Sequence, residues 1–136
     1  MVKTKVILLA ILAFILSTPA HAQQAVVIPA TQASIPITGA ITAATVIVTG
    51  QGGKSIYVTS VALVPVATSV VTFTQGTGAG CAGSTSNVTG ALTFAAGQIL
   101  NLGDGYGAVF ALAPGNSLCI TITPAASPGS LSYAIF

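Results

Sequence analysis

Residues 118–123 read Leu-Cys-Ile-Thr-Ile-Thr, and this alternation decides the fold class. In an extended chain, successive side chains point to opposite faces, so the apolar residues of this segment gather on one face. That face carries Leu118, Ile120 and Ile122, and the other carries Cys119, Thr121 and Thr123. A period of two with a single apolar face is typical of a half-buried strand in an antiparallel sheet.

The same alternation recurs along the chain. Apolar residues share a face at Ile35 and Ile37, at Val71 and Phe73, and at Leu131, Tyr133 and Ile135. Two segments that are rich in Val, Ile and Thr, 45–49 and 55–64, are expected to be longer and more fully covered strands. Pro65 is expected to end or bulge the second of them.

Clusters of Gly, Pro and Asn separate these segments and predict turns. They lie at 50–53, 76–87, 103–107, 114–116 and 124–129. The last two clusters are expected to close hairpins. We therefore predict an all-β fold, an antiparallel β-sandwich or jelly roll of about eight to ten strands, with a small β-barrel as the alternative.

The first 22 residues have the pattern of a secretory signal peptide. Lys3 and Lys5 precede an unbroken apolar run over 6–16, which is shorter than the roughly 20 residues that a membrane span needs. Ala20-His21-Ala22 is a small-residue cleavage motif, so the exported chain is expected to begin at Gln23. An uncleaved anchor is the alternative, and no membrane association is expected after cleavage.

Three regions follow from this pattern. The signal peptide covers 1–22. Residues 23–40 are only weakly patterned and are expected to form an N-terminal arm or the first strands. Residues 41–136 are expected to form the β-sandwich domain.

Charge is nearly absent, since Asp, Glu, Lys and Arg make up 3% of the 136 residues, against roughly 25% in an average soluble protein. Beyond the signal peptide only Lys54 and Asp104 are charged, and no His remains. Nucleic-acid binding is not expected, because it needs several basic side chains. One carboxylate and no His cannot form paired-carboxylate, serine-triad or typical zinc sites, so we expect no catalysis, no metal and no cofactor.

The two cysteines, Cys81 and Cys119, are expected to form an intramolecular disulfide in an exported chain. Free thiols and an intermolecular bridge are the alternatives. The bridge would tie the 76–87 loop to the 118–123 strand. Because Cys119 falls on the Thr face of that strand, the bridge would lie outside the main apolar layer.

The segment 103–107, Gly-Asp-Gly-Tyr-Gly, is the candidate contact site. It lacks the Lys and the following helix of a phosphate-binding loop, so a tight turn is the simpler interpretation. Tyr106 would be exposed in such a turn, next to Asp104. These two residues are therefore the candidates for contact with a ligand or a partner, and a sugar ring is the ligand that an exposed Tyr suggests.

From Lys54 onward, strand-like segments and glycine turns follow one another in a fixed order that includes both cysteines. In one-letter code they are IYVTS (56–60), VTF (71–73), GTGAGC (76–81), LTFAAG (92–97), GDGYG (103–107), APGNSLCIT (113–121) and GSLSYA (129–134). This order resembles that of small virion-associated proteins encoded by phages and prophages, of the head-decoration type. The resemblance implies a compact β-sandwich that binds a capsid or tail and carries no catalytic motif.

Two functions from different classes are therefore expected. The first is a non-enzymatic structural subunit, either a decoration or a surface-coat protein, that self-associates as a trimer or larger. Its partner would be a capsid or a cell-surface protein, and a surface with little charge favours such association. The second is a secreted module that binds a glycan or a host surface through its loops. The signal peptide predicts a secreted, periplasmic or cell-surface location, with the virion as the alternative.

Overall fold

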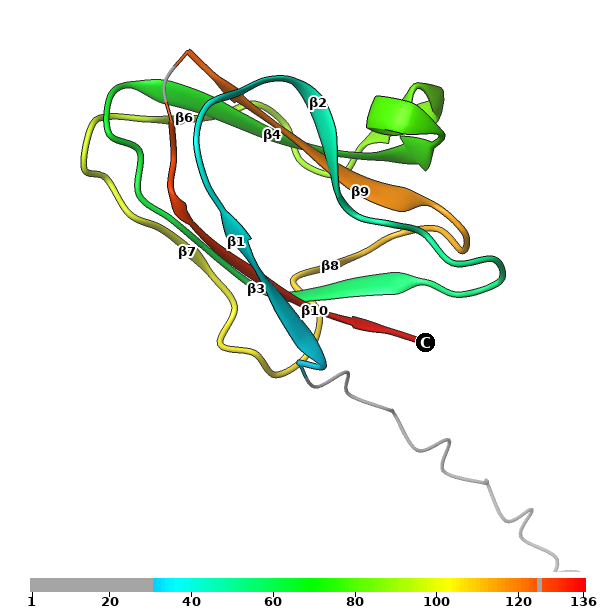
Figure 1. Ribbon diagram of the computed structural model, residues 1–136. Coiled ribbons are helices and arrows are strands. Elements are labelled where there is room, and N and C mark those ends of the chain that lie inside the picture. The colour runs from blue at the N-terminus through cyan, green and yellow to red at the C-terminus, as the bar shows by residue number, and fades with distance from the viewer. Residues whose placement is uncertain (1–30, 125) are drawn as a thin grey trace, which may run out of the picture.

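The computed structural model describes residues 31–124 and 126–136, and these form two antiparallel sheets packed face to face (Figure 1). The predicted signal peptide and its predicted cleavage site between Ala22 and Gln23 lie outside the described residues. The elements are β1 (Ala33–Ile37), β2 (Ile41–Val48), β3 (Ile56–Leu63), β4 (Ser69–Thr77), the short 3₁₀ helix η1 (Ala79–Cys81), β5 (Gly83–Asn87), β6 (Leu92–Phe94), β7 (Leu100–Leu102), β8 (Phe110–Ala111), β9 (Ser117–Thr123) and β10 (Gly129–Ile135).

The strand order confirms the predicted sandwich and gives it jelly-roll topology. One sheet has the order β1-β10-β3-β7, with β8 also on β3, and the other has the order β2-β9-β4-β5, with β6 also on β4. The first strand therefore pairs with the last, the second with the penultimate, and β3 and β4 with the pieces between. This nested pairing is the one that a long antiparallel hairpin adopts when it wraps into a jelly roll. The wrapping brings β10 beside β3 in one sheet and β9 beside β4 in the other.

The core lies between the sheets and is built from the predicted alternation. In β9, the side chains of Leu118, Ile120 and Ile122 are fully buried. Phe73 of β4 is also fully buried, and its ring lies 5.6 Å from that of Phe110, centroid to centroid. The other buried aliphatic residues of this cluster are Ile37, Val48, Ile56, Val58, Val61, Leu63, Val71, Leu100, Leu112 and Leu131.

The expected hairpins at 114–116 and 124–129 are wrong. β8 and β10 belong to one sheet and β9 to the other, so both connections cross between the sheets. A Pro-Gly or Pro-rich cluster shows where the chain reverses. It does not show which sheet receives the next strand, because that choice depends on contacts that are distant in the sequence.

The segment 76–87 is not one long loop. Gly83–Asn87 forms β5, which pairs with β4. Its Gly, Ser and Thr side chains are mostly exposed, so the segment has no buried apolar face from which a strand could be predicted. β6 pairs with the first residues of β4, along the same edge as β5.

β2 includes most of the 45–49 segment, but it is not the covered strand that the sequence suggests. Of its eight residues only Val48 is buried, and Thr42–Thr45 are exposed. β2 is an edge strand, and its register on β9 passes from Ile41 to Thr45 with a shift. By contrast, β3 is well covered as predicted and ends before Pro65.

β1 falls in the 23–40 region and pairs with β10 along its whole length. The first strand is thus part of the sandwich. Within 31–124 and 126–136, no helix is long and apolar enough to cross a membrane.

Candidate functional site

The 103–107 loop contacts β3 at a bulge in that strand. Ser60 pairs with Ser132 and Val58 with Tyr133, so Thr59 is an extra residue relative to β10. On the opposite edge of β3, β7 pairs with 61–63 and β8 with Tyr57 and Val58. The chain between β7 and β8 leaves the sheet beside this bulge, and it contains the candidate segment.

Backbone and hydroxyl contacts fix the 103–107 loop to the bulge. The Gly105 N–H donates to the Thr59 carbonyl at 3.2 Å, and the Thr31 N–H donates to the Gly105 carbonyl at 3.3 Å. The Oγ1 atoms of Thr31 and Thr59 lie 2.6 Å apart, and Thr59 is fully buried. Gly103 has φ +72°, and a Cβ there would lie 2.3 Å from the Thr59 carbonyl oxygen. The loop is therefore tied to Thr59 and Thr31 at its centre and lies close against the Thr59 carbonyl at its first residue.

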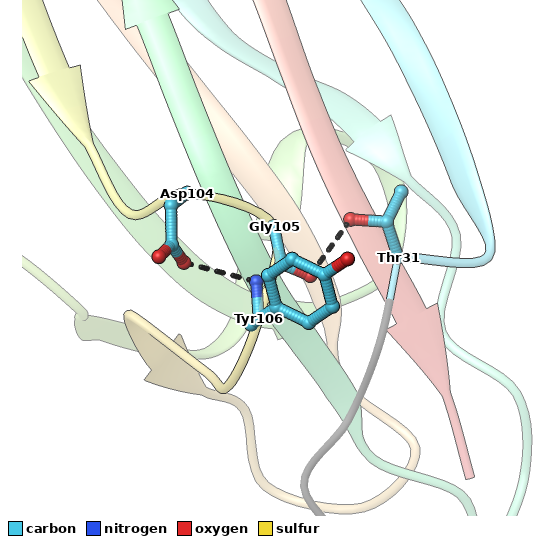
Figure 2. Close-up of a pocket in the computed structure, with 4 residues that line it drawn as sticks. All are labelled: Thr31, Asp104, Gly105 and Tyr106. Atoms are coloured by element: carbon cyan, nitrogen blue, oxygen red, sulfur yellow. Dashed lines mark hydrogen bonds between the residues drawn. The ribbon is translucent and has the colours of Figure 1, made fainter.

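Asp104 and Tyr106 lie together on the surface of this loop, as Figure 2 shows. An Asp104 carboxylate oxygen accepts a hydrogen bond from the Tyr106 N–H at 3.1 Å, which closes the turn in the manner of an Asx turn. The Tyr106 side chain is 79% exposed. Together with Thr31 and Gly105, these residues line a hollow of about 290 Å³.

The sequence singled out Asp104 and Tyr106 but missed Thr31 and Thr59. Thr31 is 74 residues away from Gly105 in the chain. Threonine is also common throughout the strands of this protein, so a single Thr does not stand out as a site residue. Only the bulge in β3 and the start of β1 bring these hydroxyls to the loop. No local signal in the sequence could have found them.

The hollow offers an aromatic face, a carboxylate and hydroxyl groups. An exposed ring can stack on the C–H face of a sugar, and a carboxylate accepts hydrogen bonds from hydroxyl groups. Among the described residues, no group of three or more His, Cys, Asp or Glu side chains lies together as a metal ion would require. The groups present in the hollow can make stacking contacts and hydrogen bonds.

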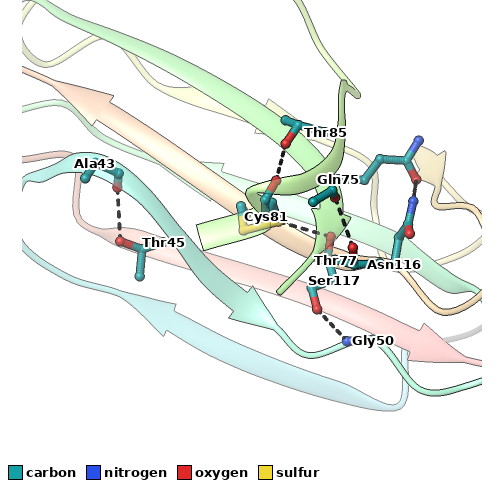
Figure 3. The surroundings of a disulfide bond; sticks show 11 residues. Ala43, Thr45, Gly50, Gln75, Thr77, Cys81, Thr85, Asn116 and Ser117 are labelled. Atoms are coloured by element: carbon teal, nitrogen blue, oxygen red, sulfur yellow. Dashed lines mark hydrogen bonds between the residues drawn. A yellow bond between two sulfur atoms is a disulfide. The ribbon is translucent and has the colours of Figure 1, made fainter. Parts of the chain in front are cut away.

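The second feature is the disulfide between Cys81 and Cys119, which confirms the predicted pairing. The Cα atoms lie 6.2 Å apart, and both residues are fully buried. Cys119 pairs with Thr74 on the face of β9 opposite the main core. Figure 3 shows η1 lying against this outer face, with the bridge beneath it.

η1 also reaches β2, at the edge of the sheet. Gly80 has φ +60°, and a Cβ there would lie 2.7 Å from the Ala44 carbonyl oxygen, so only glycine allows this approach. The Thr85 hydroxyl donates to the Cys81 carbonyl (Figure 3). The bridge therefore holds a segment that contacts β2, β4 and β9 at once.

Replacing both cysteines, in the Cys81→Ala/Cys119→Ala variant, is expected to lower the free energy of unfolding by about 4 kcal/mol. The bridge joins residues 38 positions apart. Closing a loop of that length in the unfolded chain removes conformational entropy worth about 4 kcal/mol. Urea unfolding of the oxidised chain and of the variant measures the difference. Equal midpoints and slopes would contradict a stabilising role for the bridge.

Gly103→Ala is expected to cost about 1–3 kcal/mol, because the new Cβ would meet the Thr59 carbonyl in a backbone conformation that L residues rarely adopt. Gly52→Ala is the matched control. No atom lies within 4 Å of a Cβ placed at Gly52, and its stability should change by less than about 1 kcal/mol. Thermal unfolding compares the two variants, and equal losses would show that the 103–107 loop is not clamped to β3.

Comparison of the chain with protein-family models, with curated protein sequences and with solved structures gives no significant match. The assignment of a function therefore depends on the residues and their geometry.

Proposed function

We propose that this protein is an exported, non-enzymatic structural subunit that associates with copies of itself in a surface coat or decoration layer. The observation that supports it most is the near absence of charge. Lys54 and Asp104 are the only charged side chains in the part of the chain that the structure describes. Copies of such a surface repel each other little, and contact between them buries almost no charge.

Small uncharged side chains on the outer faces of both sheets fit this role. On the sheet that contains β9, Thr72 pairs with Thr121 and Val70 with Thr123, on the face opposite the core. On the other sheet, Ser34, Ser132 and Ser60 lie in one row across three strands. Such faces carry no charge to desolvate, and their hydroxyl groups can form hydrogen bonds with a second surface.

Fold and covalent structure add support of a more general kind. Jelly rolls recur in viral capsid and lectin domains, although a fold by itself does not decide a function. The disulfide is typical of proteins that leave the reducing cytoplasm. Together with the predicted signal peptide, it favours a secreted or cell-surface location. A virion location, with a capsid as partner, is the alternative that the resemblance to decoration proteins suggests.

Native mass spectrometry of the exported protein tests the proposal. The expected species is an oligomer, a trimer or larger, of chains that begin at Gln23. Only weak dependence on protein concentration is expected in the micromolar range, since structural layers need stable contacts. A monomer at every concentration would contradict the proposal.

The exposed Tyr106 ring supports a second candidate, a module that binds neutral glycans. The ring and Asp104 line the same hollow on a loop that is fixed before any ligand arrives, and such preorganisation lowers the cost of binding. Tyr106→Ala should reduce binding to a panel of neutral oligosaccharides about tenfold, the loss of one stacking contact, and leave the unfolding midpoint unchanged. Failure of the wild-type chain to bind any of them in calorimetry would reject this candidate.

A further inference from the structure

The two ends of the sandwich differ in their chemistry. The strand registers place four connections at one end, and each of them crosses from one sheet to the other: 38–40, 64–68, 95–99 and 124–128. None of the four contains Asp, Glu, Lys, Arg or His. Lys54 lies at the opposite end, toward which β1 begins and at which β10 ends (Figure 1). We call the end formed by the four connections the uncharged end.

Aliphatic side chains are exposed together at the uncharged end. Val66 and Ile99 are 64% and 67% exposed, and Val64 is 40% exposed. The pairing of β3 with β7 ends at Leu63 and Leu100, so Val64 and Ile99 are the next residues outward on the two neighbouring segments. Single exposed apolar residues are ordinary on a protein surface, but a group of them in one place indicates an interaction surface.

Backbone hydrogen bonds hold the connections of the uncharged end to one another. The Gly97 N–H donates to the Pro65 carbonyl at 2.7 Å, which joins the 95–99 turn to the β3–β4 connection. The N–H groups of Val64 and Val66 donate to carbonyls of the 124–128 connection at 3.0 and 3.1 Å. Pro65, between the two exposed valines, is fully buried. The apolar surface is therefore shaped within the monomer, and little ordering remains to be done when a partner binds.

The composition of the uncharged end favours a second copy of this chain over a lipid surface. Binding to a membrane surface typically uses aromatic and basic side chains, and the four connections contain neither. A partner that covers these aliphatic side chains must itself be apolar and uncharged there, because a charge buried at the contact would have no counter-ion. The same end of another copy meets this condition.

We propose that the uncharged ends of neighbouring chains pack against each other, with Val64, Val66 and Ile99 at the contact. The inference rests on the proposed self-association and names the surface that carries it. Because β1 begins and β10 ends away from this surface, two such ends can meet without either strand terminus between them. Like ends meet in this contact, so it lies about a symmetry axis of the assembly.

A pair of charge variants tests whether like ends meet. Val66→Asp/Ile99→Asp places carboxylates on every chain at the contact, and the dissociation constant should rise at least tenfold because like charges face each other. Val66→Lys/Ile99→Lys should weaken association to a similar extent. An equimolar mixture of the two variants should associate again, to within about tenfold of wild type, because opposite charges then face each other. Sedimentation velocity at physiological salt measures association, and circular dichroism checks that each variant folds.

Gln51→Asp/Ala113→Asp is the matched control. It adds the same two charges at exposed positions of the opposite end, and the dissociation constant should stay within about threefold of wild type. If the Val66→Asp/Ile99→Asp variant associates as tightly as this control, or if the mixture stays dissociated, the contact is overturned while the proposed coat function stands.

Two further outcomes would also count against the contact. If the wild-type oligomer persists in Val66→Asp/Ile99→Asp and that variant instead loses binding to phosphatidylcholine vesicles, the surface serves a lipid partner and the contact between copies is wrong. A wild-type chain that is monomeric at every concentration would reject both the contact and the proposed function.

Discussion

The structure depends on β9, because this one strand both fills the core between the sheets and carries the disulfide that holds η1. Its inner face, Leu118, Ile120 and Ile122, is fully buried between the sheets. On its outer face, Cys119 binds Cys81 and so fixes η1 over the sheet. β9 also pairs with β2 on one side and β4 on the other, and the nested jelly-roll order is built around these pairs. Loss of Cys119 would detach η1 from the sheet. Loss of the three buried side chains would remove the contacts that hold the two sheets together.

Features encoded within a few residues could be predicted from the sequence. Alternation in 118–123 predicts both the core face of β9 and the placement of Cys119 away from it. The two cysteines in an exported chain predict the bridge, and the glycines of 103–107 predict an exposed turn with Tyr106 at its surface. The strand face and the turn depend on a period of two or on a local backbone preference, whereas the bridge follows from the presence of only two cysteines.

Features that depend on distant contacts could not be predicted. The sequence does not reveal that 114–116 and 124–129 change sheets, because turn residues act locally and sheet membership does not. The Val- and Thr-rich composition of β2 predicts a strand, but the same composition fits a buried strand or an edge. Thr31 and Thr59 complete the loop site only because a bulge in β3 and the start of β1 meet there.

The central claim is that chains associate through uncharged surfaces, and its salt dependence tests this most directly. Sedimentation velocity of the protein at about 0.05 M and about 1 M sodium chloride spans a change in screening length from over 10 Å to about 3 Å. The account predicts an oligomer whose association constant is the same or slightly higher at high salt, since no ion pair is screened and apolar contacts are not weakened. An oligomer that dissociates at high salt, or a monomer at both concentrations, would contradict it.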